Sequence, residues 1–550
     1  MVTKSKWFWP AALLTAWFAD FLFWGKAPGI SFPIWITVAL LIGFLLSWRE
    51  GQRPSAWSVL LAVLIVLFST VVAFRSNGPT VMYSILMAGG GIVLLAATFL
   101  NGHWLSYRIV DYVTNGLGVM WGAVSRPFIS LSTPQALPAA GEAAPQSPSA
   151  IPSPENPASV ELAAAGAKRS AIASRRRAAP VIRGVIIAIP VLAVFIALFA
   201  SADPVFNAGV TQILNIEKLP EYLLRLILII ILGFALVGVY LHAILPAAKV
   251  ERPDTSKAWL KPFLGFTETG ILLGALDVLF IIFVTLQIRY LFGGSANISE
   301  TGFTYSQYAV RGFNELVWVA TLSLLLFLVL STITRLESKG TRIAFTALIV
   351  LLMANVLVIL ASSLTRLMLY ESTYGFTVMR TLPHIFIFWL GGLVVAAAVL
   401  ELLQKRGRFG LALLIAVVGF SATLAVMNVE GFIVRKNVGR AMIGESLDVN
   451  YLSTLSSDAV PAMVKYYNDT TVPAKVHEAL GLLLACRLQE SQGQATRPWQ
   501  SYHFGQANAV KLLEANAPSL NQIHLLGGSN LTYFTWEDQM IYCNALPNLD

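Results

Sequence analysis

Arginine, glutamate, glutamine and tyrosine side chains concentrate in short stretches between residues 287 and 380, at the ends of long apolar blocks. An arginine held beside acids and tyrosines can bind a phosphate or a carboxylate, because its planar guanidinium offers paired donors. The same side chains can instead hold helix ends together, and we weigh the two interpretations equally. The members of this candidate outer polar cluster are Gln287, Arg289, Tyr290, Tyr305, Tyr308, Arg311, Glu315, Arg366, Tyr370, Glu371, Tyr374 and Arg380.

Two acids, Asp20 and Asp277, fall inside apolar blocks. Because a charge within a bilayer is costly, an intramembrane acid is a functional candidate. Asp277 lies roughly 12 Å along its block at 1.5 Å per residue, which places it near mid-membrane. A proton or cation site is one hypothesis, and a hydrogen bond to a Ser, Thr or Asn of a neighbouring helix is the other. We favour the second, since few polar residues share that depth.

Motifs of known chemistry are absent from the sequence. It contains no GxxxxGK[ST] phosphate loop, no HExxH, no GxSxG and no GxGxxG. The 6 histidines are scattered and the 2 cysteines form no CxxC pattern. We therefore expect no metal site and no cofactor, we assign no catalytic residue, and we leave open whether the protein is an enzyme.

Long apolar blocks must position these polar residues. Hydrophobic residues make up 56% of the 550 residues, charged residues only 12%, and the mean hydropathy is +0.69. Each block approaches the roughly 20 residues that a membrane-spanning helix needs, whereas a membrane β-barrel has short alternating runs. We predict an all-α integral membrane protein with about eleven transmembrane helices and a small, mainly helical C-terminal soluble domain. The predicted spans are Trp7–Gly25, Ile30–Trp48, Trp57–Phe74, Val81–Leu100, Val181–Ala200, Tyr222–Leu245, Thr269–Phe292, Phe313–Ile333, Phe345–Leu367, Leu382–Leu403 and Phe409–Met427.

The charge pattern predicts the orientation. The net charge is +9, and most of the excess Lys and Arg lies in alternate connections between the apolar blocks. Positively charged segments stay on the cytoplasmic side during insertion. We therefore expect a plasma-membrane protein with a cytoplasmic N-terminus and an extracytoplasmic C-terminal domain. Topology accounts for the basic excess, so we predict the lipid bilayer as a partner and no nucleic acid.

Composition divides the chain into five parts. Residues 1–100 form a four-helix N-terminal membrane segment, and residues 101–130 have the apolar spacing of an amphipathic helix lying in the membrane plane. Residues 131–180 are rich in Pro, Ala and Ser and are predicted to form a disordered linker. Residues 181–427 form a seven-helix membrane core, and residues 428–550 form the extracytoplasmic domain.

The linker ends in a basic run from Lys168 to Arg177. Such a run can bind anionic lipid headgroups or simply hold the linker inside the cell, and we favour the second role. In the C-terminal domain we predict helices near Ser457, over Pro473–Leu488 and over Trp499–Leu513. This domain is also where a protein partner would bind.

The two cysteines, Cys486 and Cys543, both lie in the C-terminal domain. In an oxidising compartment they can form one disulfide. Cys486 sits in an apolar run, so a buried free thiol is the alternative. The sequence leaves both open.

Several segments resemble a prokaryotic family of multi-pass membrane proteins, domain of unknown function 4173. The resemblance covers most of Val181–Pro461 and, more weakly, the first two helices. It implies a membrane location and brings no established activity, so no residue role follows from it. The segments that carry it are Asp20–Lys26, Ser201–Phe206, Gln287–Gly294, Tyr305–Glu315, Tyr370–Arg380, Leu447–Leu452 and Asp458–Pro461.

Three classes of function follow from these features. We favour a structural, sensory or regulatory membrane protein, because catalytic motifs are absent. A transporter of an ion or small solute that uses Asp277 is the first alternative, although we see no paired broken helices. A membrane enzyme acting on a lipid-linked substrate at the outer face is the second alternative, based on the outer polar cluster.

Overall fold

In a computed structural model, the chain is described over residues 7–132, 219–245, 261–292, 313–493 and 497–543, except residues 524, 529, 530 and 537, and at scattered positions between 188 and 206. The chain divides into two compact units, each described by itself below. The first unit comprises Met1–Trp24 and Trp121–Leu241, and the second comprises Gly25–Met120 and His242–Asp550.

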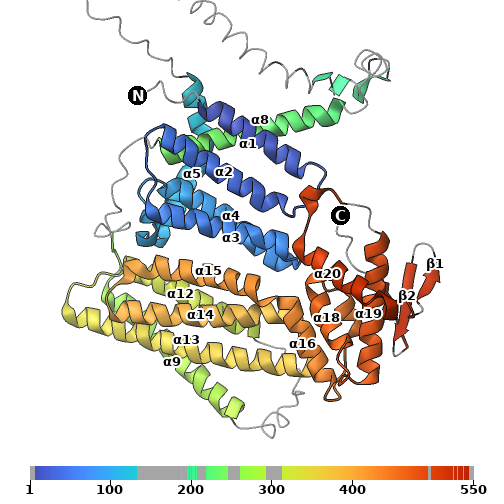
Figure 1. Cartoon of the computed structure of the whole chain (residues 1–550). Helices are drawn as coiled ribbons and strands as arrows, with labels where there is room; N and C mark the ends of the chain where they lie inside the picture. Colours follow the sequence, from blue (N-terminus) through green and yellow to red (C-terminus); the bar gives the residue numbers. More distant parts are fainter. Residues whose placement is uncertain are drawn as a thin grey trace, which may run out of the picture. The chain divides into compact units, whose positions relative to one another are not determined.

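Long apolar helices dominate the described residues (Figure 1). Nine of them are long and apolar enough to cross a membrane, which confirms a multi-pass, all-α membrane protein. Each coincides with a predicted span. They are α2 (Ser31–Arg49), α3 (Ala56–Phe74), α4 (Gly78–Thr98), α8 (Leu219–Ile244), α9 (Phe266–Phe292), α12 (Phe313–Ile333), α13 (Lys339–Tyr374), α14 (Val378–Leu402) and α15 (Phe409–Met427).

The two other predicted spans have different outcomes. The first is helix α1 (Phe8–Phe23), which is apolar but has only 16 residues. The predicted span Val181–Ala200 lies largely outside the described residues, as do the linker and its basic run from Lys168 to Arg177. The predicted limits of the five parts of the chain therefore remain predictions.

In the first unit, α1 pairs with α8. The Arg225 guanidinium of α8 donates to both Asp20 carboxylate oxygens, with its Nε 3.1 Å from each. The Trp24 indole nitrogen donates to Glu221 at 2.6 Å. Helix α5 (Ile109–Ser132), whose residues from Trp121 onward belong to this unit, occupies the segment where the sequence predicts an amphipathic helix, and its apolar residues Trp121 and Phe128 are exposed.

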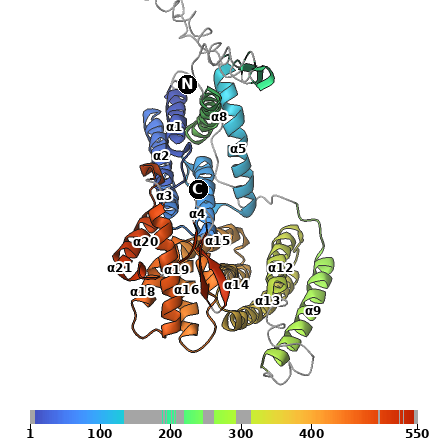
Figure 2. The ribbon, with the colours of Figure 1, turned by 90° about the vertical axis from the view of Figure 1, so that its right-hand side faces the viewer.

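In the second unit, α13 is the central membrane helix. It packs against α9, α12 and α14, and Figure 2 shows α9, α12 and α13 running side by side. The fully buried side chains of Leu273, Phe327 and Ile349 fill this contact. Ser338 starts α13 with a reciprocal capping box, and Gly375 ends it with a φ of 79°, which few residues other than glycine adopt.

Helix α13 is longer than its predicted span. It has 36 residues, roughly 54 Å at 1.5 Å per residue, and runs seven residues beyond Leu367 to Tyr374. Hydropathy marks only the part within the bilayer. The additional turns carry Tyr370 and Glu371 of the outer polar cluster beyond the apolar block.

Helices α16 to α21 form the C-terminal domain at one end of α13, α14 and α15 (Figure 1). Its core includes the fully buried Leu452, Met463, Leu480 and Leu484. The helices of the domain are α16 (Val429–Ala441), α17 (Val449–Ser453), α18 (Val460–Tyr467), α19 (Ala474–Gly493), α20 (Phe504–Ala515) and α21 (Ala517–Leu520), and its 3-10 turns are η4 (Ser457–Ala459) and η5 (Trp499–Ser501). Helices occur near Ser457 and over Pro473–Leu488 as predicted, whereas the segment Trp499–Leu513 is divided between η5 and α20. Two further 3-10 turns, η2 (His103–Ser106) and η3 (Arg406–Arg408), connect the longer helices.

The C-terminal domain also contains a small sheet that the sequence did not reveal. Three antiparallel strands follow one another in the order β1 (Leu526–Gly528), β2 (Leu531–Trp536) and β3 (Gln539–Tyr542). Beside them, a disulfide joins Cys486 of α19 to Cys543, with 5.2 Å between their Cα atoms. Both cysteines are buried. The disulfide therefore ties the end of the sheet to the core of the domain.

We expect that replacing Cys543 with Ser destabilises the C-terminal domain by roughly 2 to 4 kcal/mol, because the disulfide closes a long loop in the unfolded chain. Thermal unfolding of the full chain, monitored with and without reductant, measures this. Reductant should lower the melting temperature of wild type and leave that of the variant unchanged. Two free thiols in the unreduced, denatured wild type would contradict the assignment.

Burial raises the pKa of Glu490 on α19 to about 7, against the opposing effect of Arg487. The folded state thus holds the Glu490 proton more tightly than the unfolded state, whose pKa is about 4.3. The stability from this proton is complete below about pH 4 and is lost as the pH rises to about 7. The melting temperature of wild type should therefore fall over this pH range. We expect Glu490→Gln to reduce this fall, whereas Glu514→Gln, at an exposed position, should show the same fall as wild type.

Candidate functional site

Residues of the outer polar cluster meet in pairs at the ends of helices. Gln287 of α9 accepts hydrogen bonds from Arg366 Nη2 at 2.8 Å and from Ser362 Oγ at 3.0 Å, both on α13. Arg366 is buried, with 8% of its surface exposed. This contact fixes the C-terminal part of α9 against α13.

A second pair connects α13 to α14. Glu371, which is 1% exposed, lies with its Oε2 atom 3.1 Å from His384 Nδ1. A buried carboxylate needs a partner, since leaving it alone in a low dielectric costs several kcal/mol. The pair therefore holds the first turns of α14 against the end of α13.

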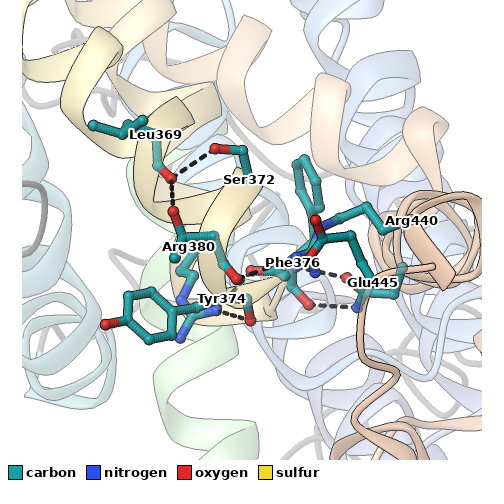
Figure 3. Close-up of polar contacts among 10 residues, drawn as sticks. Leu369, Ser372, Tyr374, Phe376, Arg380, Arg440 and Glu445 are labelled. Carbon is teal, nitrogen blue, oxygen red and sulfur yellow. Dashed lines mark hydrogen bonds and ion pairs between the residues drawn. The ribbon is translucent and has the colours of Figure 1, made fainter. Parts of the chain in front are cut away.

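Arg380 closes that turn. It donates to the carbonyl oxygens of Tyr374 and Gly375 at 2.9 and 2.6 Å, and its guanidinium carbon lies 4.2 Å from the centre of the Tyr370 ring. Figure 3 shows Arg380 with Tyr374, and nearby the polar contacts of the Arg440 side chain. The end of a helix leaves carbonyl groups without partners, and Arg380 satisfies two of them.

The turn after α13 is also bound to α16. Arg440 donates to the Thr373 carbonyl at 3.1 Å and to Glu445 at 3.3 Å (Figure 3). Asn437 accepts from the Phe376 backbone nitrogen and donates to the Phe376 carbonyl. These bonds run from the membrane helices to the first helix of the C-terminal domain.

Other predicted members of the cluster are not brought together. Glu315 is exposed on α12 and makes no hydrogen bond or ion pair with the residues that the structure describes. Arg289 and Tyr290 belong to α9, but their side chains are not among those that the structure describes. Tyr305, Tyr308 and Arg311 lie outside it altogether. The described contacts join helices to one another or cap the end of α13, and a ligand site at this cluster remains a prediction.

The two intramembrane acids differ in their surroundings. Asp20 is held by Arg225, as described above. Asp277 is 2% exposed, and neither of its carboxylate oxygens lies within hydrogen-bonding distance of a partner in the described chain. Asn355 of α13 is the polar side chain that interacts with it. No group of three or more His, Cys, Asp or Glu residues that could hold a metal ion occurs among the described residues.

A second polar network, which the sequence did not single out, lies where the α3–α4 loop contacts the C-terminal domain. The Glu430 carboxylate at the start of α16 accepts from Asn77 Nδ2 at 2.8 Å. Its other oxygen accepts from the Ser456 backbone nitrogen at 2.8 Å and from the Ser456 hydroxyl at 2.5 Å. Glu430 is 4% exposed, so it is a buried acid with three donors.

Asp458 extends this network. One of its oxygens, Oδ2, accepts from the backbone nitrogens of Ser76 and Asn77 at 2.9 and 3.1 Å. Burial raises the pKa of both Asp458 and Glu430, although the hydrogen bonds partly oppose it. Nearby, His503 Nε2 lies 3.0 Å from the Arg75 carbonyl oxygen, and burial lowers the pKa of this imidazole. The interface is therefore polar, desolvated and hydrogen-bonded.

A cavity of about 640 Å³ opens beside this network, within the size range of small-molecule sites. A polar side, including Arg75 and Asp458, faces an apolar side, including Phe74 and Phe504. The sequence contains one sign of the neighbouring polar network, because Glu430 follows the last apolar block by only three residues. The cavity is lined by Thr70, Val71, Phe74, Arg75, Ala425, Val426, Asn428, Ser457, Asp458, Pro461, Phe504, Gly505 and Asn508.

Comparison with protein families gives a match. A family model described as domain of unknown function (DUF4153) matches residues 36–466. The sequence resemblance pointed to a different domain of unknown function, 4173. The match confirms a family defined by a domain of unknown function, and the domain that matches is DUF4153. Comparison with curated proteins and with solved structures gave no match.

We expect Arg366→Ala to destabilise the protein by roughly 1 to 3 kcal/mol, because it removes a buried side chain and leaves the half-buried Gln287 oxygen with one donor fewer. Arg335 serves as a matched control, since it is exposed and donates to the Pro262 carbonyl. Thermal unfolding in detergent compares the two alanine variants. Equal melting temperatures for Arg366→Ala and Arg335→Ala would contradict a structural role for the buried contact.

Proposed function

Since this chain belongs to the DUF4153 family, whose domain is of unknown function, we propose a role from its geometry: a sensory or regulatory membrane protein whose C-terminal domain is mechanically coupled to the membrane helices. The observation that carries this proposal is the Glu430 network. It joins the α3–α4 loop to the C-terminal domain through buried hydrogen bonds. A domain fixed in this way can pass a change in its own structure to the helices.

Contacts at two other connections, and a further contact at the end of α3, support the coupling. The Ile30 backbone nitrogen, before α2, donates to the Tyr502 carbonyl at 2.9 Å. The Phe74 and Phe504 rings stack with their centres 4.6 Å apart. Phe376, after α13, is bound by α16 as described above. The domain thus contacts the connections that follow α1, α3 and α13, and is attached directly after α15.

The predicted orientation belongs to this proposal. In the predicted order of spans, the connections after the first, third, ninth and eleventh helices lie on one side of the membrane, and these are the connections that the domain contacts. The disulfide between Cys486 and Cys543 supports an oxidising compartment for that side. We therefore propose an extracytoplasmic C-terminal domain at the plasma membrane, open to a protein partner.

A transporter is the second candidate, supported by one observation. Asp277 is buried against α13, where Asn355 interacts with it, but its carboxylate oxygens and the Asn355 Nδ2 atom make no hydrogen bond of good geometry within the described residues. Buried polar groups are normally hydrogen-bonded, so an exception calls for a functional account. A proton or cation carried between these residues would supply one.

We expect Glu430→Gln to weaken the coupling. The substitution turns one of the two carboxylate oxygens into an amide nitrogen, which cannot accept the hydrogen bond from Asn77 or from Ser456. The loss should be roughly 1 to 3 kcal/mol. Hydrogen exchange of the α3–α4 loop measures it, with faster exchange expected at residues 75–80. Glu445→Gln is the control, since the Glu445 side chain is 54% exposed. Unchanged loop exchange in Glu430→Gln would overturn the proposed coupling.

A further inference from the structure

The 640 Å³ cavity holds two opposite charges that do not pair with each other. Arg75 and Asp458 both line it, and Arg75 acts electrostatically on Asp458. Within the described residues they form no ion pair at 4.0 Å or less. A cation and an anion that line one cavity without pairing match a ligand that carries both a negative and a positive group.

Arg75 and Asp458 each have one charged-group atom that makes no hydrogen bond with the described residues. Arg75 uses Nε and Nη2 to donate to the carbonyl oxygens of Ala425 and Val426, at 2.9 and 3.1 Å, while Nη1 has no hydrogen-bond partner in the described chain. Asp458 uses Oδ2 for the two backbone nitrogens of the α3–α4 loop. Its Oδ1 accepts no hydrogen bond from the described residues and lies toward Gly505, which lines the cavity. Asp458 is 4% exposed, so this free oxygen belongs to a buried side chain.

The cavity lies where two membrane-spanning helices end. Part of its wall comes from the last turns of α3 and α15, which end at Phe74 and Met427. Phe74 is 52% exposed and Val426 is 81% exposed, so the apolar lining is accessible from outside the chain. Asp458 and Asn508, which are polar lining residues, belong to the C-terminal domain. A ligand that fits has a charged head and an apolar tail.

We propose that this cavity binds the headgroup of an ethanolamine phospholipid, with the phosphate at Arg75, the ammonium at Asp458 and the acyl chains along Phe74 and Val426. An arginine suits a phosphate, because its nitrogens can donate more than one hydrogen bond. A primary ammonium can donate to the free Asp458 oxygen, whereas a quaternary choline cannot. A glycerol headgroup would leave Asp458 without a positive partner. The inference rests on the proposed function, since it names the ligand class of the sensory domain.

Binding to the purified full-length protein tests the proposal without using any cellular phenotype. Its failure is therefore distinguishable from failure of the coupling measured by hydrogen exchange. The probes are short-chain phosphatidylethanolamine, phosphatidylcholine, phosphatidylglycerol and soluble phosphoethanolamine, each titrated in detergent while the melting temperature is recorded. We expect the ethanolamine lipid to stabilise the protein at concentrations at least about tenfold lower than the other three.

Two variants locate the binding site. Asn508→Trp places a large side chain into the cavity from an exposed position, and Glu514→Trp places the same side chain on an exposed position of α20 outside the cavity. Asp458→Asn can keep an oxygen for the loop nitrogens while it presents an amide to the ligand. We expect about tenfold weaker binding of the ethanolamine lipid in Asn508→Trp and Asp458→Asn, and wild-type binding in Glu514→Trp.

The outcomes divide clearly. Preference for the ethanolamine lipid that is lost in Asn508→Trp supports the proposal, even if Asp458→Asn fails to fold. Equal stabilisation by all three lipids overturns it, as does a preference that Asn508→Trp leaves intact. Stabilisation by soluble phosphoethanolamine at the same concentration as by the lipid would also overturn it, because the ligand would then be a free solute.

Discussion

The buried carboxylate of Glu430 is the constraint on which the second unit depends. A carboxylate that is 4% exposed is tolerated only if donors replace the lost water. Here the donors come from two places far apart in the sequence, the α3–α4 loop and Ser456. If either place moves, a charge or a donor is left buried and unsatisfied. The network therefore forces the loop and the domain to keep one arrangement.

The same solution recurs at other helix ends. Glu401, fully buried near the end of α14, binds Arg406 at 2.5 Å and the Thr346 hydroxyl of α13 at 2.9 Å. Asp20 and Arg225 do the same for α1 and α8. Apolar side chains gain little by leaving lipid for another helix, so packing and polar contacts must decide which helices associate. Polar contacts at the ends of these helices therefore contribute to the choice of helix partners.

The sequence predicted the membrane-spanning helices well, but it did not predict which polar side chains contact one another. Apolar blocks of about 20 residues locate a spanning helix because lipid allows few alternatives. Hydropathy cannot place Asn77 beside Asp458, which lies 381 residues away and is reached only through tertiary packing. It also missed the last turns of α13, whose polar residues continue the helix until Gly375. The sheet was missed because its strands are short and follow a helical segment.

Asp458 links the cavity to the constraint imposed by Glu430. One of its oxygens holds the α3–α4 loop, and the other lies toward the cavity. A positive group near the free oxygen would stabilise the charged form of the whole carboxylate, which burial otherwise disfavours. A charged carboxylate is the stronger acceptor, so the hydrogen bonds to the loop would strengthen. Because coupling between two sites is reciprocal, a firmly held loop would in turn favour the ligand. A single side chain is thus sufficient to connect what occupies the membrane edge with the position of two membrane helices.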